Sequence, residues 1–139
     1  MKKQIPIFFA VDDNYVPQLK VALSSLMEHA SKDYNYIIYI LNIQLSNESR
    51  KAIRKIRHKG FKIVFYSVES QMENLAKRLN VRDYYTMTTY YRLILPKTFF
   101  FLKKAIYLDS DILVRGDISE LYNVDMGDNY VAAVPDASV

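Results

Sequence analysis

The chain has 139 residues, a net charge of +4 and no cysteine; half of its residues are apolar and 24% are charged. This length allows one domain with a hydrophobic core but not two, and the apolar content excludes a disordered chain. The absence of cysteine excludes disulfides and thiolate metal sites, and it agrees with a cytoplasmic location.

Apolar runs of strand length alternate along the chain with segments of helical periodicity. The first run follows Lys2 and Lys3 like the start of a signal peptide, but it contains Pro6 and leads straight into Asp12 and Asp13, so we interpret it as a buried strand. No run approaches the roughly 20 apolar residues of a membrane span, so we expect no transmembrane segment. In chain order we expect a strand at 5–11, a helix at 16–30, a strand at 36–41, a helix from a cap at Ser46 to a stop at Gly60, a strand at 61–66, a helix at 72–79, a short helix at 88–95 closed by Pro96, and strands at 105–108, 112–114 and 130–134.

This alternation predicts an α/β fold with a mostly parallel, Rossmann-like sheet flanked by helices. Ligands of such sheets bind at the carboxyl ends of the strands. Three of the expected strands end in acidic residues at that edge, with Val11 leading to Asp12, Leu108 to Asp109 and Val134 to Asp136. Their convergence predicts a site for a cation or a polar ligand.

Asp109-Ser110-Asp111 lies between two apolar triplets. In an extended chain residues i and i+2 point to the same side, so both carboxylates would share one face. Two close negative charges are unfavourable unless a cation neutralises them, and Mg²⁺ or Mn²⁺ does so while leaving coordination positions for phosphate oxygens. The D-x-D pattern is common, and the alternative is a turn in which one Asp caps a helix. The apolar flanks favour the metal site.

Two other segments carry candidate ligand contacts. Asp12 and Asn14 can accept hydrogen bonds from a base or a ribose, and Tyr15 can stack on a ring. The simpler interpretation is a strand-to-helix turn, where Asp and Asn are favoured for capping. Arg92 follows polar and aromatic residues at 88–91, and its planar guanidinium suits a diphosphate. A salt bridge to a surface acid is the competing interpretation.

Basic residues crowd into positions 50–62. At helical spacing they form one face, which could contact nucleic acid or an anionic membrane surface. No Phe, Tyr or Trp interleaves the basic residues from 50 to 60 to stack on bases, so we expect no nucleic-acid partner. The simpler interpretation is a solvated helix face, and the alternative is a peripheral contact of a cytoplasmic protein with a membrane.

Five motifs occur in a characteristic order: A-V-D-D-N-Y at 10–15, T-T-Y-Y-R-L at 88–93, K-A-I-Y-L-D-S-D-I-L-V at 104–114, D-I-S-E-L-Y-N-V-D at 117–125 and V-P-D at 134–136. Together they resemble the family 8 glycosyltransferases, a group that includes glycogenin and bacterial lipopolysaccharide galactosyltransferases. The resemblance implies a glycosyltransferase A-type fold with one nucleotide-sugar-binding domain over 1–139. It also implies transfer of a hexose, with retention of configuration, from a UDP-sugar to a glycan or lipid-linked acceptor.

The resemblance implies a role for each matching residue. Asp109 and Asp111 would ligate Mn²⁺ or Mg²⁺, which bridges the UDP diphosphate. Arg92 would reach the donor sugar or its phosphates, and Asp136 would bind the sugar hydroxyls at the reaction centre, so both are candidate catalytic residues. The remaining residues that would bind the nucleotide-sugar are Ala10, Asp12, Asn14, Tyr15 and Ser110.

Family members continue past the point where this sequence stops, with a histidine that completes the metal site and residues that hold the acceptor. Neither His29 nor His58 stands in a matching context. We therefore expect the donor-binding part of such an enzyme, incomplete at its C-terminus, with weak metal and nucleotide affinity and little or no transfer. We also expect self-association through an exposed apolar edge.

Other classes fit the sequence less well. A haloacid dehalogenase-type phosphatase also has D-x-D after a strand, but it wants Thr or Val where this chain has Leu113. A receiver-type signalling domain needs an Asp after its third strand, and 61–69 contains none. A dinucleotide oxidoreductase needs a glycine-rich turn, and three scattered glycines do not make one. A noncatalytic nucleotide-sugar-binding module remains the main alternative to an enzyme.

Overall fold

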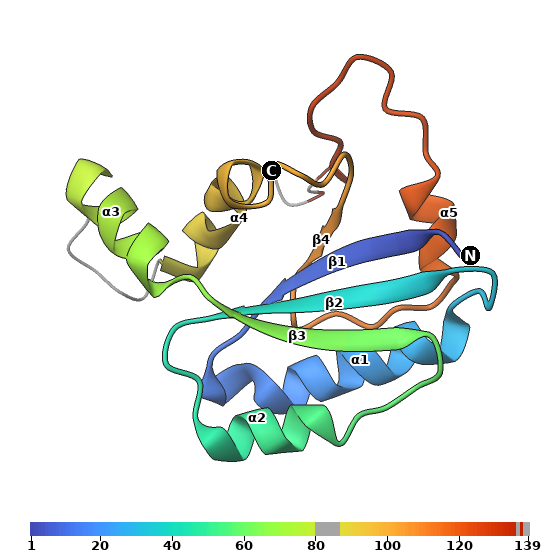
Figure 1. Ribbon diagram of the computed structural model, residues 1–139, viewed down its shortest axis with the longest axis horizontal. Coiled ribbons are helices and arrows are strands. Elements are labelled where there is room, and N and C mark those ends of the chain that lie inside the picture. The colour runs from blue at the N-terminus through green and yellow to red at the C-terminus, as the bar shows by residue number, and fades with distance from the viewer. Residues whose placement is uncertain (80–86, 136, 138–139) are drawn as a thin grey trace.

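The computed structural model describes residues 1–79, 87–135 and 137, with the backbone alone for 87–89 (Figure 1). Its elements are β1 (Gln4–Ala10), a short 3-10 helix η1 (Asp13–Tyr15), α1 (Val16–His29), β2 (Asn35–Asn42), α2 (Asn47–Arg54), β3 (Phe61–Ser67), α3 (Glu69–Leu79), α4 (Met87–Thr98), β4 (Ile106–Leu108) and α5 (Ile118–Tyr122). Among the residues that the structure describes, every helix falls short of the length and apolar content that a bilayer crossing demands.

The four strands form one parallel sheet in the order β3-β2-β1-β4. Each connection between consecutive strands contains at least one helix, as parallel strands require. The fold class is therefore confirmed: an α/β domain with a Rossmann-like parallel sheet. Because β1 lies between β2 and β4, the turns that follow β1 and β4 emerge next to each other at the carboxyl edge.

Alternate residues of β1 face opposite sides of the sheet and build two apolar layers. Ile5, Ile7 and Phe9 pack with α1 and α2 in the larger layer, and Phe8 packs in the smaller one. Figure 1 shows α1 and α2 on one side of the sheet and α3 and α4 on the other. The continuous apolar run of β1 is explained by this burial on both faces. The smaller layer comprises Phe8, Leu41, Val68, Met72, Tyr91, Ile94 and Phe99.

Two predicted strands are wrong, namely 112–114 and 130–134, because neither segment forms a strand in the structure. Ile112 and Val114 are apolar because they cover α1: both join the larger layer, and the Val114 amide donates to the Ser25 hydroxyl at 2.9 Å. Segment 130–135 is exposed throughout, with Tyr130 fully so. An apolar run therefore does not by itself specify whether the segment pairs as a strand, packs on a helix or stays exposed.

The predicted helix after Ser46 is too long at its far end. Ser46 caps α2 as expected, its hydroxyl accepting from the Ser49 amide at 3.1 Å. The helix ends at Arg54, however, and Gly60 serves the next strand instead: it has φ +86°, and its carbonyl accepts from the Tyr36 amide at 2.8 Å. Lys59 is therefore outside the helix.

One further helix boundary differs from expectation, and one helix was not predicted. Helix α4 contains Pro96 and continues to Thr98, because a proline in the last turn removes only its own amide bond. Helix α5 was not predicted. Asp117 caps it by accepting from the Ser119 amide at 3.0 Å, and Glu120 stands in its first turn. This D-x-x-E pattern is close to a capping box, so the signal was present in the sequence.

Candidate functional site at the carboxyl edge of the sheet

The candidate site lies where β1 and β4 end side by side. The ladder between them ends with Phe9 opposite Leu108, and the next residues along each chain are Ala10 and Asp109. Ala10 is half-buried against the smaller apolar layer. Two steps beyond Ala10 the chain reaches Asp12, so the acidic turns that follow both strands meet at one edge, as predicted for these two strands. The third expected strand, at 130–134, does not form, and Asp136 lies outside the described residues.

Asp109 and Asp111 are both exposed, whereas Ser110 between them is buried. The chain turns at Ser110 and Asp111 instead of continuing as a strand, so the expected extended backbone at this motif is wrong. The burial pattern is nevertheless the expected one: Asp109 and Asp111 are exposed to solvent, and Ser110 between them is buried. Both carboxylates are open to solvent at the sheet edge.

Arg92 of α4 reaches this motif. Its guanidinium lies 3.8 Å from Oδ1 of Asp109 and 5.2 Å from the centre of the Tyr107 ring. The Arg92 and Asp109 side chains are 52% and 62% exposed, so the pair is solvated and contributes at most about 1 kcal/mol. The surface salt bridge considered for Arg92 is present, and its acid is one of the two candidate metal ligands. Two predicted site residues are thus brought together.

Two tyrosines that the sequence analysis did not single out, Tyr91 and Tyr107, lie near the predicted site residues. Burial, together with smaller effects of the nearby Asp12 and Tyr107, raises the pKa of Tyr91 to about 12. Burial also raises the pKa of Tyr107, with Arg92 opposing and Asp109 reinforcing the shift. These couplings place both tyrosines among the predicted site residues. Their positions in the sequence could have identified them, because Tyr91 directly precedes Arg92 and Tyr107 directly precedes Leu108-Asp109.

The turn after β1 combines capping with exposed groups. Oδ1 of Asp12 accepts from the Tyr15 amide at 3.1 Å, and Oδ1 of Asp13 accepts from the Ser46 amide at 3.1 Å. The capping interpretation is therefore correct for Asp12, whereas Asp13 links this turn to the residue that precedes α2. Asn14 is exposed, and the Tyr15 ring is 45% exposed. The ring and the amide of Asn14 are accessible to a ligand, as is the second oxygen of Asp12.

Within the described ranges, no cluster of three or more His, Asp or Glu residues is arranged to hold a metal ion. His29 ends α1, and its Nδ1 lies 2.8 Å from the Ser25 carbonyl oxygen. His58 precedes β3. Both histidines therefore belong to the opposite edge of the sheet from Asp109. The available donors are hard carboxylate oxygens in an open position, which fits Mg²⁺ or Mn²⁺ bound by two protein ligands and by oxygens of another molecule.

Some of the predicted site lies outside the described residues. Asp136, the expected contact to the sugar, is one such residue, and the side chains of Thr88 and Thr89 are also outside.

Residues 6–139 match the sequence model of glycosyl transferase family 8. The chain belongs to this family. A putative glycosyltransferase of Haemophilus influenzae is 33% identical over 135 residues, covering 96% of this chain and 39% of that protein. The glycosyltransferase GlyE of Streptococcus pneumoniae is 32% identical over 130 residues, which are 91% of this chain and 30% of GlyE. The chain thus spans well under half the length of these relatives.

Solved structures with the same fold agree with this placement. The bifunctional glycosyltransferase WbbM, in its apo form, superposes with a TM-score of 0.80 at 28% identity over 98% of this chain and 24% of that one. The galactosyltransferase LgtC, crystallised with donor and acceptor sugar analogues, superposes with a TM-score of 0.67 at 29% identity, covering 91% of this chain and 45% of LgtC. The glycosyltransferase A-type fold is confirmed, and enzymes of this family generally use a nucleotide-sugar donor and a divalent metal.

Proposed function

We propose that this chain is the donor-binding part of a metal-dependent, retaining glycosyltransferase that transfers a hexose from a UDP-sugar. The observation that carries the proposal is the convergence of three elements at one sheet edge. The turn after β1 brings Asp12, the turn after β4 brings Asp109 and Asp111, and α4 brings Arg92. Membership of family 8 supports the reaction class.

In this proposal Asp109 and Asp111 hold Mn²⁺ or Mg²⁺. A bound divalent cation would supply Lewis acidity that stabilises the negative charge developing on the departing diphosphate. The two exposed carboxylates suit this role because they offer hard oxygen ligands and leave the outer coordination positions to the diphosphate. With only two protein ligands in the described part of the chain, we expect weak metal affinity.

Arg92 is the proposed diphosphate or sugar contact. Its guanidinium is already within reach of Asp109, so a diphosphate held at that carboxylate would meet it. The Tyr107 ring beneath it restricts where it can swing. Planar, two-pronged recognition of phosphate oxygens is the chemistry that distinguishes arginine from lysine here.

The nucleoside is proposed to lie along the turn after β1. Tyr15 offers an exposed ring for stacking on uracil, and Asp12 and Asn14 offer acceptors for base or ribose. Ala10 and the buried Ser110 would contribute through their backbones. Asp136 would bind the sugar hydroxyls.

The proposal is tested by calorimetric titration of UDP with and without Mn²⁺. The wild-type chain should bind UDP more tightly with Mn²⁺, and Asp109→Asn should abolish that difference. Asp33→Asn is the matched control, because Asp33 is exposed and precedes β2 at the opposite edge of the sheet. Metal-dependent UDP binding that survives in Asp109→Asn would refute the assignment of Asp109.

A noncatalytic nucleotide-sugar-binding module is the second candidate. In the described residues, two carboxylates in place of a full metal shell favour it. Incubation with a panel of UDP-hexoses and Mn²⁺ separates the two. Release of UDP that depends on Asp109 indicates the enzyme, whereas binding without release indicates the module.

The acceptor is proposed to be a glycan or a lipid-linked sugar, as in synthesis of lipopolysaccharide or another bacterial glycan, with the protein in the cytoplasm. We also propose self-association through the apolar surface at the C-terminal segment, where Tyr130, Val131 and Val134 are 100%, 78% and 86% exposed. Sedimentation of wild type against Tyr130→Ser/Val131→Ser tests this, and a monomeric wild type at all concentrations would contradict it.

A further inference from the structure

An exposed aromatic turn joins α4 to β4 on the side of the sheet away from α2. Phe99 is buried in the smaller apolar layer, and its carbonyl accepts from the Leu102 amide at 2.9 Å. Phe100 and Phe101 are therefore the two central residues of a closed turn, and they are 82% and 62% exposed. The buried ring of Phe99, 6.0 Å from that of Phe101, fixes the base of the turn. The rings of Phe100 and Phe101 are thus exposed to solvent on a turn whose base is fixed by the packing of Phe99.

Exposed residues of α4 lead to this turn along one helical face. Leu93, Lys97 and Phe100 follow one another at spacings of four and three residues, and all three are exposed. Leu93 is 60% exposed. Phe101 and Lys103 follow them as the next exposed residues, and Phe101 lies 6.0 Å from Phe100 between ring centres. We call this set the docking patch: Leu93, Lys97, Phe100, Phe101 and Lys103.

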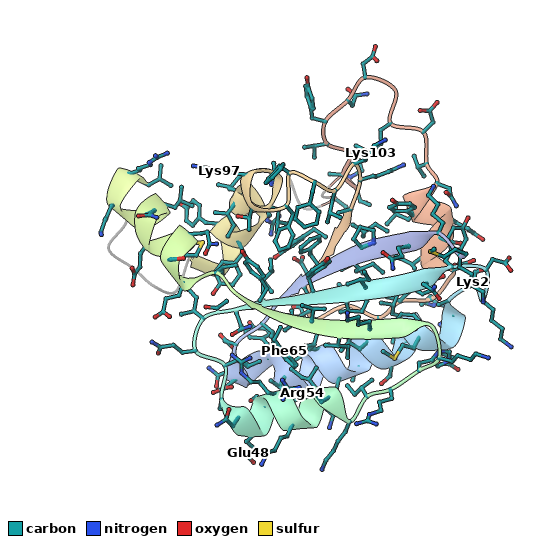
Figure 2. The ribbon with its side chains drawn as sticks, in the orientation of Figure 1. Lys2, Glu48, Arg54, Phe65, Lys97 and Lys103 are labelled. Atoms are coloured by element: carbon teal, nitrogen blue, oxygen red, sulfur yellow. The ribbon has the colours of Figure 1, made fainter. Side chains whose placement is uncertain are left out.

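The charge around the docking patch has one sign. From Met87 to Leu108 the sequence contains four basic residues and no acidic one. Of these, Arg92 pairs with Asp109, and Lys104 donates to the Val124 carbonyl at 2.7 Å. In the described part of the chain, Lys97 and Lys103 have no carboxylate within salt-bridge distance, since Arg92–Asp109 is the only ion pair there. Figure 2 shows both lysines on the α4 side of the sheet.

We propose that the docking patch binds the surface of an anionic phospholipid bilayer. Exposed Phe and Leu side chains insert at the boundary between headgroups and acyl chains, and lysines beside them bind the anionic headgroups. Each feature of the patch matches one part of this partner. The inference is independent of the donor site, because no residue of the docking patch is among those proposed to bind the metal or the nucleotide-sugar.

The basic cluster on and after α2 is the competing membrane surface, and the structure disfavours it. Arg50 and Arg54 lie over the Phe65 ring at 5.3 and 5.0 Å, and Figure 2 shows Arg54 beside Phe65 on the α2 side. Arg50 also donates to the Leu45 carbonyl at 3.1 Å. In the described residues, no large apolar side chain from 47 to 62 is exposed. This surface has charge but lacks an apolar group for insertion.

The chain contains no tryptophan, which permits a direct test with a single fluorescent reporter. F101W places the only indole in the docking patch, and Y130W places one at a fully exposed position elsewhere. We expect vesicles of equimolar phosphatidylcholine and phosphatidylglycerol to shift the emission of F101W to the blue and to leave that of Y130W unchanged. Pure phosphatidylcholine vesicles should give a much smaller shift.

Vesicle flotation with charge variants supplies the second measurement. Lys97→Ala/Lys103→Ala should weaken binding about 25-fold, at about fivefold for each lysine near an anionic surface. Lys51→Ala/Lys55→Ala removes the same charge from α2 and its C-cap and should have no effect. Phe100→Ser/Phe101→Ser should abolish flotation without changing the thermal midpoint, because both rings are exposed.

Three outcomes would overturn the proposal. Wild-type protein that does not float with anionic vesicles is one, and binding lost in the α2 variant but kept in the docking-patch variants is another. A blue shift of F101W that follows protein concentration without vesicles would assign the patch to self-association instead. Loss of UDP binding by any variant has no bearing on these readouts, so failure of the proposed function is distinguishable from failure of this inference.

Discussion

Replacing Arg92 by methionine should change metal binding and nucleotide binding in opposite directions. In the ligand-free structure the Arg92 guanidinium lies 3.8 Å from the Asp109 carboxylate, the position proposed for the cation. A divalent ion about 5 Å from a guanidinium is repelled by about 1.7 kcal/mol in water, and screening at physiological ionic strength reduces this to about 0.9 kcal/mol. Arg92→Met should therefore bind Mn²⁺ alone about fivefold more tightly.

The same substitution should weaken binding of UDP in the presence of Mn²⁺. If Arg92 donates charge-assisted hydrogen bonds to the diphosphate, their loss costs about 1.5 kcal/mol or more, equivalent to about tenfold in affinity. The folded state should hardly change, because the lost ion pair is solvated and contributes at most about 1 kcal/mol.

Both affinities are measurable on the same samples. Electron paramagnetic resonance reports free Mn²⁺ during titration, and calorimetry reports UDP binding at saturating Mn²⁺. Lys97→Met is the matched control, since it removes one positive charge from the same helix and Lys97 has no ion-pair partner in the described residues. Equal behaviour of the two variants, or a loss of Mn²⁺ affinity in Arg92→Met, would refute the reasoning.

Three other predictions concern stability. Ser46→Ala should destabilise the fold by about 1 kcal/mol in urea titrations, because the Ser49 amide loses its cap; an unchanged midpoint would show that water replaces it. Burial alone would raise the pKa of Asp117, but hydrogen bonds from the Ser119 and Ser31 amides lower it below 3.8. The ionised Asp117 side chain therefore stabilises the fold above pH 3.8, and this stabilisation is lost as the pH falls through the lower pKa that Asp117 has in the folded state. Asp117→Asn should accordingly reduce the difference between the urea midpoints measured at neutral and at acid pH. Tyr91 has a pKa raised to about 12, so it favours the folded state below pH 10 and loses that effect as the pH rises towards 12. Tyr91→Phe should remove one late-ionising tyrosine from the ultraviolet titration, and an unaltered late phase would contradict the shift.

Most of the sheet followed from the sequence because its strands are continuous apolar runs, and β1 in particular is buried on both faces. Continuous apolar runs ending in acids located β1 and β4, and the parallel topology then required their carboxyl ends to lie together. The parallel topology alone therefore predicted that Asp12 and Asp109 lie at the same edge, with no information on side-chain contacts. The prediction rested on topology, which local residue patterns encode well.

Contacts that depend on position in space could not be predicted in the same way. The apolar residues at 112–114 pack on α1 instead of pairing as a strand. The pairing of Arg92 with Asp109 joins residues from different elements, so no spacing rule indicates it. Tyr91 and Tyr107 were visible as neighbours of site residues, but their roles depend on burial.

The weakness of the Arg92–Asp109 pair bears on how the proposed site would be filled. A buried pair at this position would compete strongly with a cation, because separating desolvated charges is costly. Here both side chains are more than half exposed, so displacing Arg92 from Asp109 costs at most about 1 kcal/mol, or about fivefold in affinity. The pair therefore keeps the guanidinium near the position proposed for the diphosphate without closing the carboxylate to a metal. Low metal affinity in this chain would then follow mainly from the number of protein ligands, two in the described residues, because competition by Arg92 accounts for about fivefold at most.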